Sequence, residues 1–92
     1  MVSRSTTVVN QLGLHARAAA KFVHTATRYS AHVRVAYCGR EMDGKSIMGL
    51  LLLAAARGAM ITIAAEGADE EQAVDALAAL VDSGFGEDVC SV

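Results

Sequence analysis

The segment His32–Met42, HVRVAYCGREM, decides the fold class of this chain. Apolar side chains occupy every second position of its first part: Val33, Val35 and Tyr37. This two-residue period is typical of a strand with one buried face, so a strand is predicted over His32–Cys38. Gly39 permits a tight turn, and Arg40–Met42 is predicted to return as the partner strand of a hairpin. An antiparallel hairpin in a small chain favours a sheet with helices packed on one face.

Two further strands are predicted from runs of β-branched residues, over Ser5–Val9 and Met60–Ala65. Between the first of these strands and the hairpin, small apolar residues recur at helical spacing. They predict a helix over residues 16–29, with Arg17 and Lys21 elsewhere on the helical wheel. The segment before it, Asn10–Gly13, is a loop by its composition.

Two more helices complete the predicted order. The hydroxyl of Ser46 is suited to cap a short helix over residues 47–53. Asp69 and Gln72 have the spacing of a capping box, so a last helix should begin there and stop near Gly84. The order β-α-β-β-α-β-α predicts an α+β open-faced sandwich, in which three helices cover one side of a four-stranded antiparallel sheet.

Composition restricts the class of protein. The 92 residues include 18 Ala and no Pro, and 20% are charged, which predicts one folded domain over residues 1–92 with a tail over about 86–92. All eight Lys and Arg lie within residues 1–57, whereas residues 58–92 carry eight of the ten acids. With a pI near 5.8 and few aromatic residues, a dedicated nucleic-acid binder is not expected.

The cysteines and the apolar runs bear on the compartment. Cys38 and Cys90 belong to no C-x-x-C pair, and we interpret them as a packed residue and a tail residue in a reducing cytosol. The longest apolar run, Ile47–Ala56, is about half the length of a membrane span. No signal peptide is evident after Met1. The sequence therefore predicts a cytoplasmic protein that does not insert into membranes.

Residues Gly39–Ser46 match the phosphate-binding pattern G-x-x-x-x-G-K-[ST] letter for letter. Glu41 and Asp43 would repel a triphosphate, and Glu41 and Met42 look like strand residues that return from the turn. The domain is also too small for the parallel sheet that normally carries such a loop. We interpret the match as a coincidence, and a nucleotide-binding protein remains the alternative.

His15 and Arg17 form the most informative pair of polar residues. His15 lies where a loop passes into a helix, so free N–H groups and the positive end of the helix dipole lie near its ring. The dipole favours neutral imidazole, whose lone pair can attack a phosphoryl group, and Arg17 adds a planar donor for phosphate oxygens. On spacing alone, a histidine that merely caps the helix is the simpler interpretation.

Two motifs together favour the phosphoryl-acceptor interpretation of His15 over the capping one. Asn10–Ala20, NQLGLHARAAA, and Gly44–Gly49, GKSIMG, resemble the HPr family of phosphocarrier proteins of the phosphotransferase system. The length, the element order and Gly67–Ala73, GADEEQA, agree with this resemblance. Many sugar-system members have Pro where this chain has Ala18, and in this respect the chain is similar to the nitrogen-related branch, NPr.

The resemblance implies a covalent intermediate in phosphoryl transfer rather than an enzyme with its own small-molecule substrate. Enzyme I would phosphorylate His15 on Nδ1, Arg17 would stabilise the phosphate, and an enzyme IIA-type protein would accept it. Ser46 matches the position that a dedicated kinase phosphorylates in some members. No metal or organic cofactor is implied, and a monomer is expected. A binding module that keeps the fold without the phosphorylation cycle remains a further alternative.

A docking surface is expected beside His15. Four leucines at Leu50–Leu53 cannot all face inward from one short helix, so part of this run should be exposed to a partner. The residues expected to contact partners are Ala16, Ala20, Ile47, Met48 and Leu51. His24 and His32 match no compact ligand pattern with His15, and we interpret them as surface or packing residues rather than metal ligands.

Overall fold

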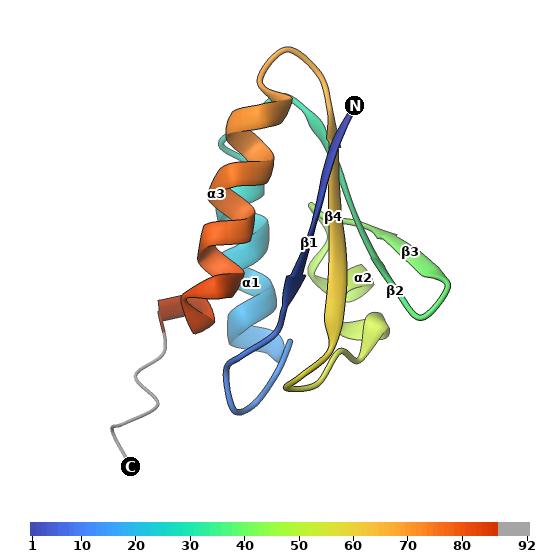
Figure 1. Cartoon of the computed structure of the whole chain (residues 1–92), viewed down its shortest axis with the longest axis vertical. Coiled ribbons are helices and arrows are strands. Elements are labelled where there is room, and N and C mark those ends of the chain that lie inside the picture. Colours follow the sequence, from blue (N-terminus) through green and yellow to red (C-terminus); the bar gives the residue numbers. More distant parts are fainter. Residues whose placement is uncertain (87–92) are drawn as a thin grey trace.

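The computed structural model describes residues 1–86, and it contains one four-stranded sheet with the strand order β1-β4-β2-β3. Every neighbouring pair of strands is antiparallel (Figure 1). The strands are β1 (Val2–Thr7), β2 (His32–Tyr37), β3 (Arg40–Asp43) and β4 (Met60–Glu66). The hairpin predicted around Gly39 is formed by β2 and β3, in the register Tyr37↔Arg40. Beyond Gly86, the expected tail and Cys90 lie outside the described residues.

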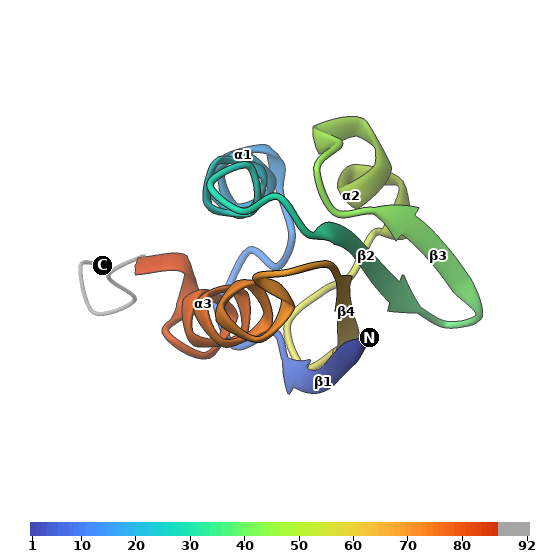
Figure 2. The ribbon, with the colours of Figure 1, turned by 90° about the horizontal axis from the view of Figure 1, so that it is seen from above.

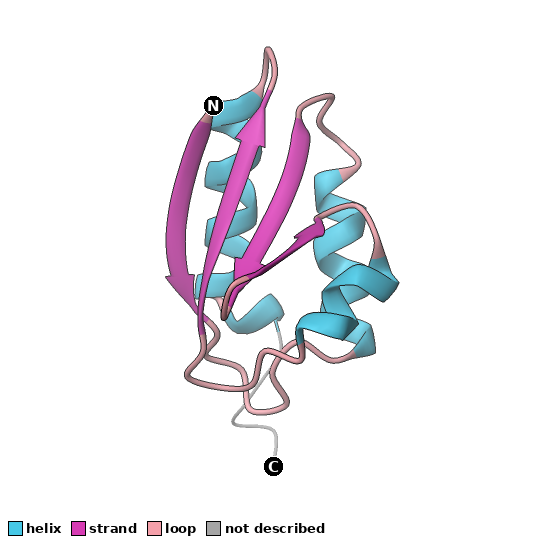
Figure 3. Ribbon diagram, turned by 90° about the vertical axis from the view of Figure 1, so that its right-hand side faces the viewer, coloured by secondary structure: helices cyan, strands magenta, loops and turns pink. Residues whose placement is uncertain are grey.

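Three α-helices lie on the same face of this sheet (Figure 2). They are α1 (Ala16–Ala26), α2 (Ile47–Leu53) and α3 (Glu70–Asp82), and a short 3-10 turn, η1 (Gly84–Gly86), follows α3. The other face of the sheet carries no helix (Figure 3). The predicted α+β open-faced sandwich with the order β-α-β-β-α-β-α is therefore confirmed. Within residues 1–86, no helix is long and apolar enough to cross a bilayer.

The core fills the space between the sheet and the helices, and alanines bring the helices close to it. Fully buried alanines lie on both long helices: Ala18, Ala19 and Ala26 on α1, and Ala73 on α3. Phe22 and Phe85 are the two largest side chains in the buried set. A small side chain at the helix surface shortens the distance at which helices pack, which suits a chain with few aromatic residues.

Two predicted boundaries were wrong by several residues. β1 begins at Val2 rather than Ser5, because its ladder with β4 runs from Val2↔Ala65 to Thr7↔Met60. α1 ends at Ala26 rather than Tyr29. There the Thr27 hydroxyl donates to the His24 carbonyl oxygen and the last turn tightens. Such side-chain bonds to the backbone compete with helix continuation.

The capping box predicted at Asp69 was also wrong. Asp69 precedes α3, but its carboxylate makes no cap hydrogen bond. It accepts instead from the backbone N–H groups of Ser30 and Ala31, each at 2.9 Å, in the loop before β2. Glu70 accepts from the Gly67 N–H at 3.1 Å. Asp69 therefore joins two loops that are 38 residues apart in sequence, which local spacing does not reveal.

This cross-link predicts an acid-sensitive contribution to stability. The Ser30 N–H bond, with that from Ala31, holds the pKa of Asp69 below its ordinary value of 3.8. A carboxyl whose pKa is lowered by folding stabilises the fold above its unfolded pKa, and this stability is lost as the pH falls below about 4. We expect Asp69→Asn to be less stable than wild type at pH 7 and to lose less stability on acidification. Urea unfolding midpoints of both proteins, measured between pH 7 and pH 2, give the slope of stability against pH for each.

Asp75→Asn is the matched control for this measurement, because Asp75 is an exposed partner of Arg4 at 2.6 Å. Surface ion pairs contribute little, so Asp75→Asn should follow the wild-type slope. If wild type and Asp69→Asn lose stability equally on acidification, the hydrogen bonds of Asp69 to the Ser30 loop do not contribute to the acid sensitivity of the fold.

Candidate functional site

His15 is the N-cap of α1, and its ring faces the start of the helix. Its backbone is extended, with φ −85° and ψ −178°, and the Nδ1 atom accepts from the Arg17 backbone N–H at 3.2 Å. The side chain is partly exposed. An acceptor at Nδ1 carries its lone pair there, so the neutral ring holds its proton on Nε2. His15 Nδ1 is thus an acceptor nitrogen at a helix N-terminus, an arrangement that is compatible with both the cap and the phosphoryl-acceptor interpretations.

Among the described residues, four hydrogen bonds of the loop before His15 stand out. The Gly13 N–H donates to the Asn10 carbonyl at 3.1 Å, and the His15 N–H donates to the Gly13 carbonyl at 2.9 Å. Leu14 N–H donates to the Ala55 carbonyl at 2.9 Å, and the Asn10 side chain donates to the Gly13 carbonyl at 2.7 Å. The contribution of the segment after α2 was not predicted, since nothing near Ala55 in sequence points to residue 14.

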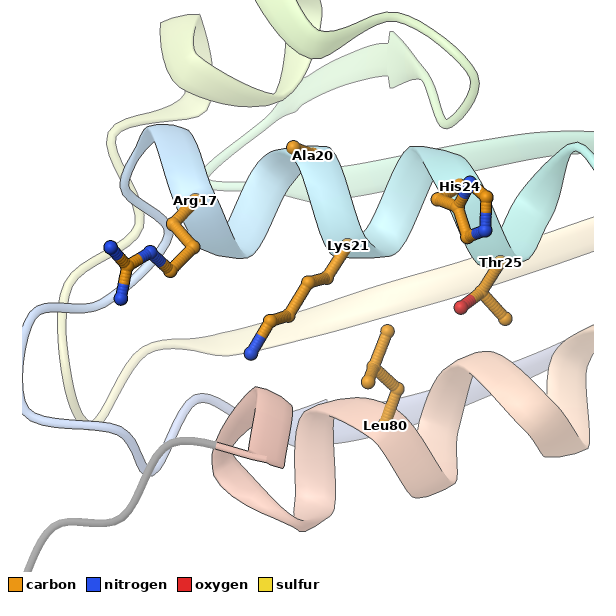
Figure 4. Close-up of a pocket in the computed structure, with 6 residues that line it drawn as sticks. All are labelled: Arg17, Ala20, Lys21, His24, Thr25 and Leu80. Atoms are coloured by element: carbon orange, nitrogen blue, oxygen red, sulfur yellow. The ribbon is translucent and has the colours of Figure 1, made fainter.

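Arg17 is the second residue of α1, in its first turn, and is exposed. It borders an open groove of about 430 Å³ between α1 and α3, lined by Arg17, Ala20, Lys21, His24, Thr25 and Leu80. Figure 4 shows Arg17 and Lys21 projecting from the same side of α1. Lys21 Nζ donates to the Phe85 carbonyl at 2.8 Å, which ties the groove to the end of the described chain. The site beside His15 is therefore cationic.

Ser46 is the N-cap of α2, as predicted. Its hydroxyl oxygen accepts from the Gly49 N–H at 3.0 Å, and the residue is partly exposed. Lys45 lies beside it, but Lys45 Nζ donates to the Tyr29 carbonyl at 2.8 Å. The Asp43 carboxylate accepts from the Lys45 N–H at 2.9 Å. The polar groups at the start of α2 are thus satisfied within the fold.

The segment that matches a phosphate-binding pattern is not a phosphate-binding loop. Cys38 and Gly39 form the tip of the hairpin with φ of +51° and +78°. Residues 40–43 form β3 and pair with β2, so the middle of the motif lies in a ladder instead of wrapping around an anion. Cys38 is exposed at this tip, so its interpretation as a packed residue was wrong: a turn position directs the side chain to solvent.

The residues expected at a docking surface lie on α1 and α2, two helices that contact each other. Leu50 and Leu53 are buried, whereas Leu52 is 53% exposed, so the prediction that part of the leucine run is exposed is confirmed. Met48 is 66% exposed and Ile47 43%. Ala16 and Ala20 are exposed on α1, and Leu51 is partly buried.

One apolar residue near the site was missed from sequence. Leu12 is 72% exposed in the loop that precedes Gly13. Its position immediately before the Gly13-Leu14-His15 sequence was the available signal. His24 lies in the α1 groove and His32 on β2. Within residues 1–86, no three His, Cys, Asp or Glu side chains are placed to hold a metal ion.

Comparison with known proteins identifies a family over almost the whole chain. A family model described as "PTS HPr component phosphorylation site" matches residues 2–83. A phosphocarrier protein HPr from Cupriavidus necator is 47% identical over 87 residues, which cover 95% of this chain and 98% of that protein. A phosphocarrier protein NPr from Shewanella violacea is 38% identical over 86 residues, 94% of each chain.

Solved structures agree in fold. The crystal structure of HPr-C-His from Thermoanaerobacter tengcongensis has a TM-score of 0.92 and 41% identity, and covers 96% of this chain and 99% of that one. A phosphocarrier protein HPr from Bacillus anthracis has a TM-score of 0.84 and 45% identity, and covers 87% of this chain and 95% of that one. Since relatives of both names occur, assignment to the nitrogen-related branch stays a prediction.

Proposed function

The chain belongs to the HPr family of phosphocarrier proteins of the phosphotransferase system, and from this premise we propose that His15 accepts a phosphoryl group from phosphorylated enzyme I and passes it to an enzyme IIA-type protein. Enzyme I would itself be charged from phosphoenolpyruvate. The observation that carries the proposal is the position of His15 Nδ1, 3.2 Å from the Arg17 backbone nitrogen at the start of α1.

The geometry supports an in-line transfer. The bond from phosphorus to the donor nitrogen breaks as the bond to His15 Nδ1 forms, while Nε2 keeps its proton. The Arg17 N–H then loses Nδ1 as its acceptor and is placed to donate to a phosphate oxygen, where the helix dipole also favours negative charge. No atom of the helix has to move far, because the donor that holds the free ring also serves the phosphorylated one.

The partner surface is proposed to be the exposed apolar area of α1 and α2 beside His15. Ala16, Ala20, Ile47, Met48 and Leu51 would form its centre, and the basic residues of α1 would lie at its edge. Such an area around a reactive residue suits partners with an apolar patch and acidic surroundings. We place this activity in the cytoplasm, on the support of the family alone.

Replacing Arg17 with Ala should slow phosphorylation of His15 without destabilising the fold. A charged hydrogen bond to the transferred group contributes about 1–3 kcal/mol of transition-state stabilisation, which corresponds to about 5-fold to 150-fold in rate. An exposed arginine contributes little to stability. Single-turnover transfer from phosphorylated enzyme I measures the rate, and thermal melting measures stability.

Arg28→Ala serves as the control, because Arg28 is an exposed cation beyond the far end of α1 from His15 and does not line the groove. It should transfer at close to the wild-type rate. If both variants slow equally, the effect comes from overall charge and not from a specific role of Arg17.

Ser46→Asp should slow phosphorylation of His15 while the melting temperature holds. An acidic group at the N-terminus of α2 suits the helix dipole, so the fold should be kept or slightly stabilised. The added charge borders Ile47 and Met48, and it would disfavour docking of an acidic or apolar partner surface. Ser3→Asp, which adds the same charge at an exposed residue of β1, should leave the rate unchanged. An unchanged rate for Ser46→Asp, or a clear loss of stability, would contradict this prediction.

A further inference from the structure

Asn10 is a fully buried polar residue at the base of the loop that carries His15. It is 0% exposed, although most of its neighbours in the loop are open to solvent. Its side-chain Nδ2 donates to the Gly13 carbonyl at 2.7 Å, and its own carbonyl accepts from the Gly13 N–H at 3.1 Å. Asn10 also packs beneath Gly84, where an added Cβ would lie 3.6 Å from the Asn10 Cβ. Asn10 therefore packs the loop against the turn η1 that follows α3.

The Gly13 carbonyl is the point through which Asn10 reaches the site. That oxygen accepts from the Asn10 side chain and also from the His15 N–H at 2.9 Å. Two donors fix the orientation of the peptide between Gly13 and Leu14 more narrowly than one. This peptide precedes the extended backbone of His15, and that backbone brings Nδ1 to the Arg17 N–H.

We propose that Asn10 is a positioning residue for phosphoryl transfer, acting through the Gly13 carbonyl to hold the His15 ring in its attacking orientation. The inference rests on the proposed function, since it assumes that His15 is the phosphoryl acceptor. The physical reason is that a reacting nitrogen displaced by about 1 Å from its line of attack can lose about 100-fold in rate. The buried side-chain amide of Asn10 restricts the orientation of the loop, which its backbone hydrogen bonds alone would leave more variable.

The test compares Asn10→Ala with Thr6→Val in transfer from phosphorylated enzyme I. Thr6 is 6% exposed, and its hydroxyl donates to the Asp82 carboxylate and not to the His15 loop, so Thr6→Val also removes one hydrogen bond of a buried polar residue. For Asn10→Ala we expect the maximal rate of transfer, measured at a saturating concentration of the variant, to fall by about 10-fold to 100-fold. The concentration of the variant that gives half of this rate should be unchanged. Thr6→Val should keep the wild-type maximal rate. Equal rates for Asn10→Ala and wild type, or an equal fall in both variants, would overturn the proposal.

A second readout does not depend on transfer. Amide hydrogen exchange of His15 should speed up at least 10-fold in Asn10→Ala, because its acceptor loses its fixed orientation, while exchange of Ile63 in β4 changes much less. Unchanged His15 exchange would also overturn the proposal. If wild type itself takes no phosphoryl group, the proposed function fails, and the exchange rates alone then decide whether Asn10 holds the loop.

Discussion

Replacing His15 with Asn should abolish phosphoryl transfer and leave the stability of the fold close to wild type. The Asn side-chain oxygen can accept from the Arg17 N–H as His15 Nδ1 does, so the cap of α1 is kept, but an amide has no nucleophilic lone pair to take the phosphoryl group. His15→Ala should also abolish transfer, and in addition cost about 1 kcal/mol through the lost cap. The pair separates the chemical role of His15 from its structural one.

The measurement is incubation with enzyme I and labelled phosphoenolpyruvate, followed by denaturant unfolding of each variant. Label on wild type should be acid-labile and stable in alkali. His24→Asn and His32→Asn should retain full labelling, since neither residue lies at the start of a helix. Full labelling of His15→Asn would show that another residue is the acceptor. A large stability loss in His15→Asn would show that the cap is not interchangeable.

The second large effect is expected at Gly13. Its φ of +69° disfavours any other residue, and an added Cβ would lie 2.7 Å from the Ala55 carbonyl oxygen and 2.9 Å from the Ala56 Cα. Both neighbours are backbone atoms, so they cannot move aside without disturbing the segment that accepts from Leu14. Gly13→Ala should therefore cost about 3 kcal/mol or more and impair transfer, because the loop before His15 must shift.

Gly39→Ala is the control for Gly13→Ala. Gly39 has a similar φ of +78°, but an added Cβ there meets no atom within 4 Å. Its cost should be about 1 kcal/mol, the strain of a left-handed backbone alone, with transfer unaffected. Denaturant midpoints and transfer rates of the two variants separate the cost of the left-handed backbone, common to both, from the cost of steric overlap with Ala55 and Ala56, present only at Gly13. Equal costs at both positions would mean that the packing of Gly13 on Ala55 contributes nothing.

Features that depend on neighbours in sequence were predictable. The alternation over residues 32–38 and the turn at Gly39 led to the hairpin, and Ser46 led to the start of α2. His15 was placed at a helix start by the composition of the segment before it, although its exact cap bond was not predicted. These features are local because a turn, a cap and a periodic face each involve only a few consecutive residues.

Contacts between distant segments were not predictable. The Asp69 carboxylate does not cap α3. It accepts instead from the backbone N–H groups of Ser30 and Ala31, which lie in a loop distant in sequence. The bond from Leu14 to Ala55 depends on how α2 is placed against α1, which no periodicity reports. Leu12 was missed and Cys38 was misjudged for a related reason: their exposure is decided by the direction of a loop or turn and not by their hydrophobicity.

The central claim is tested most directly by locating the phosphoryl group on the wild-type chain. The protein would be phosphorylated with enzyme I and phosphoenolpyruvate, and the histidine ring nitrogens observed by ¹⁵N–¹H correlation spectroscopy. The account predicts a single modified residue, His15, with phosphorus bonded to Nδ1, the nitrogen that faces the Arg17 N–H in the free protein. A phosphoryl group on Nε2 of His15, on another residue, or absent from the chain altogether would contradict it.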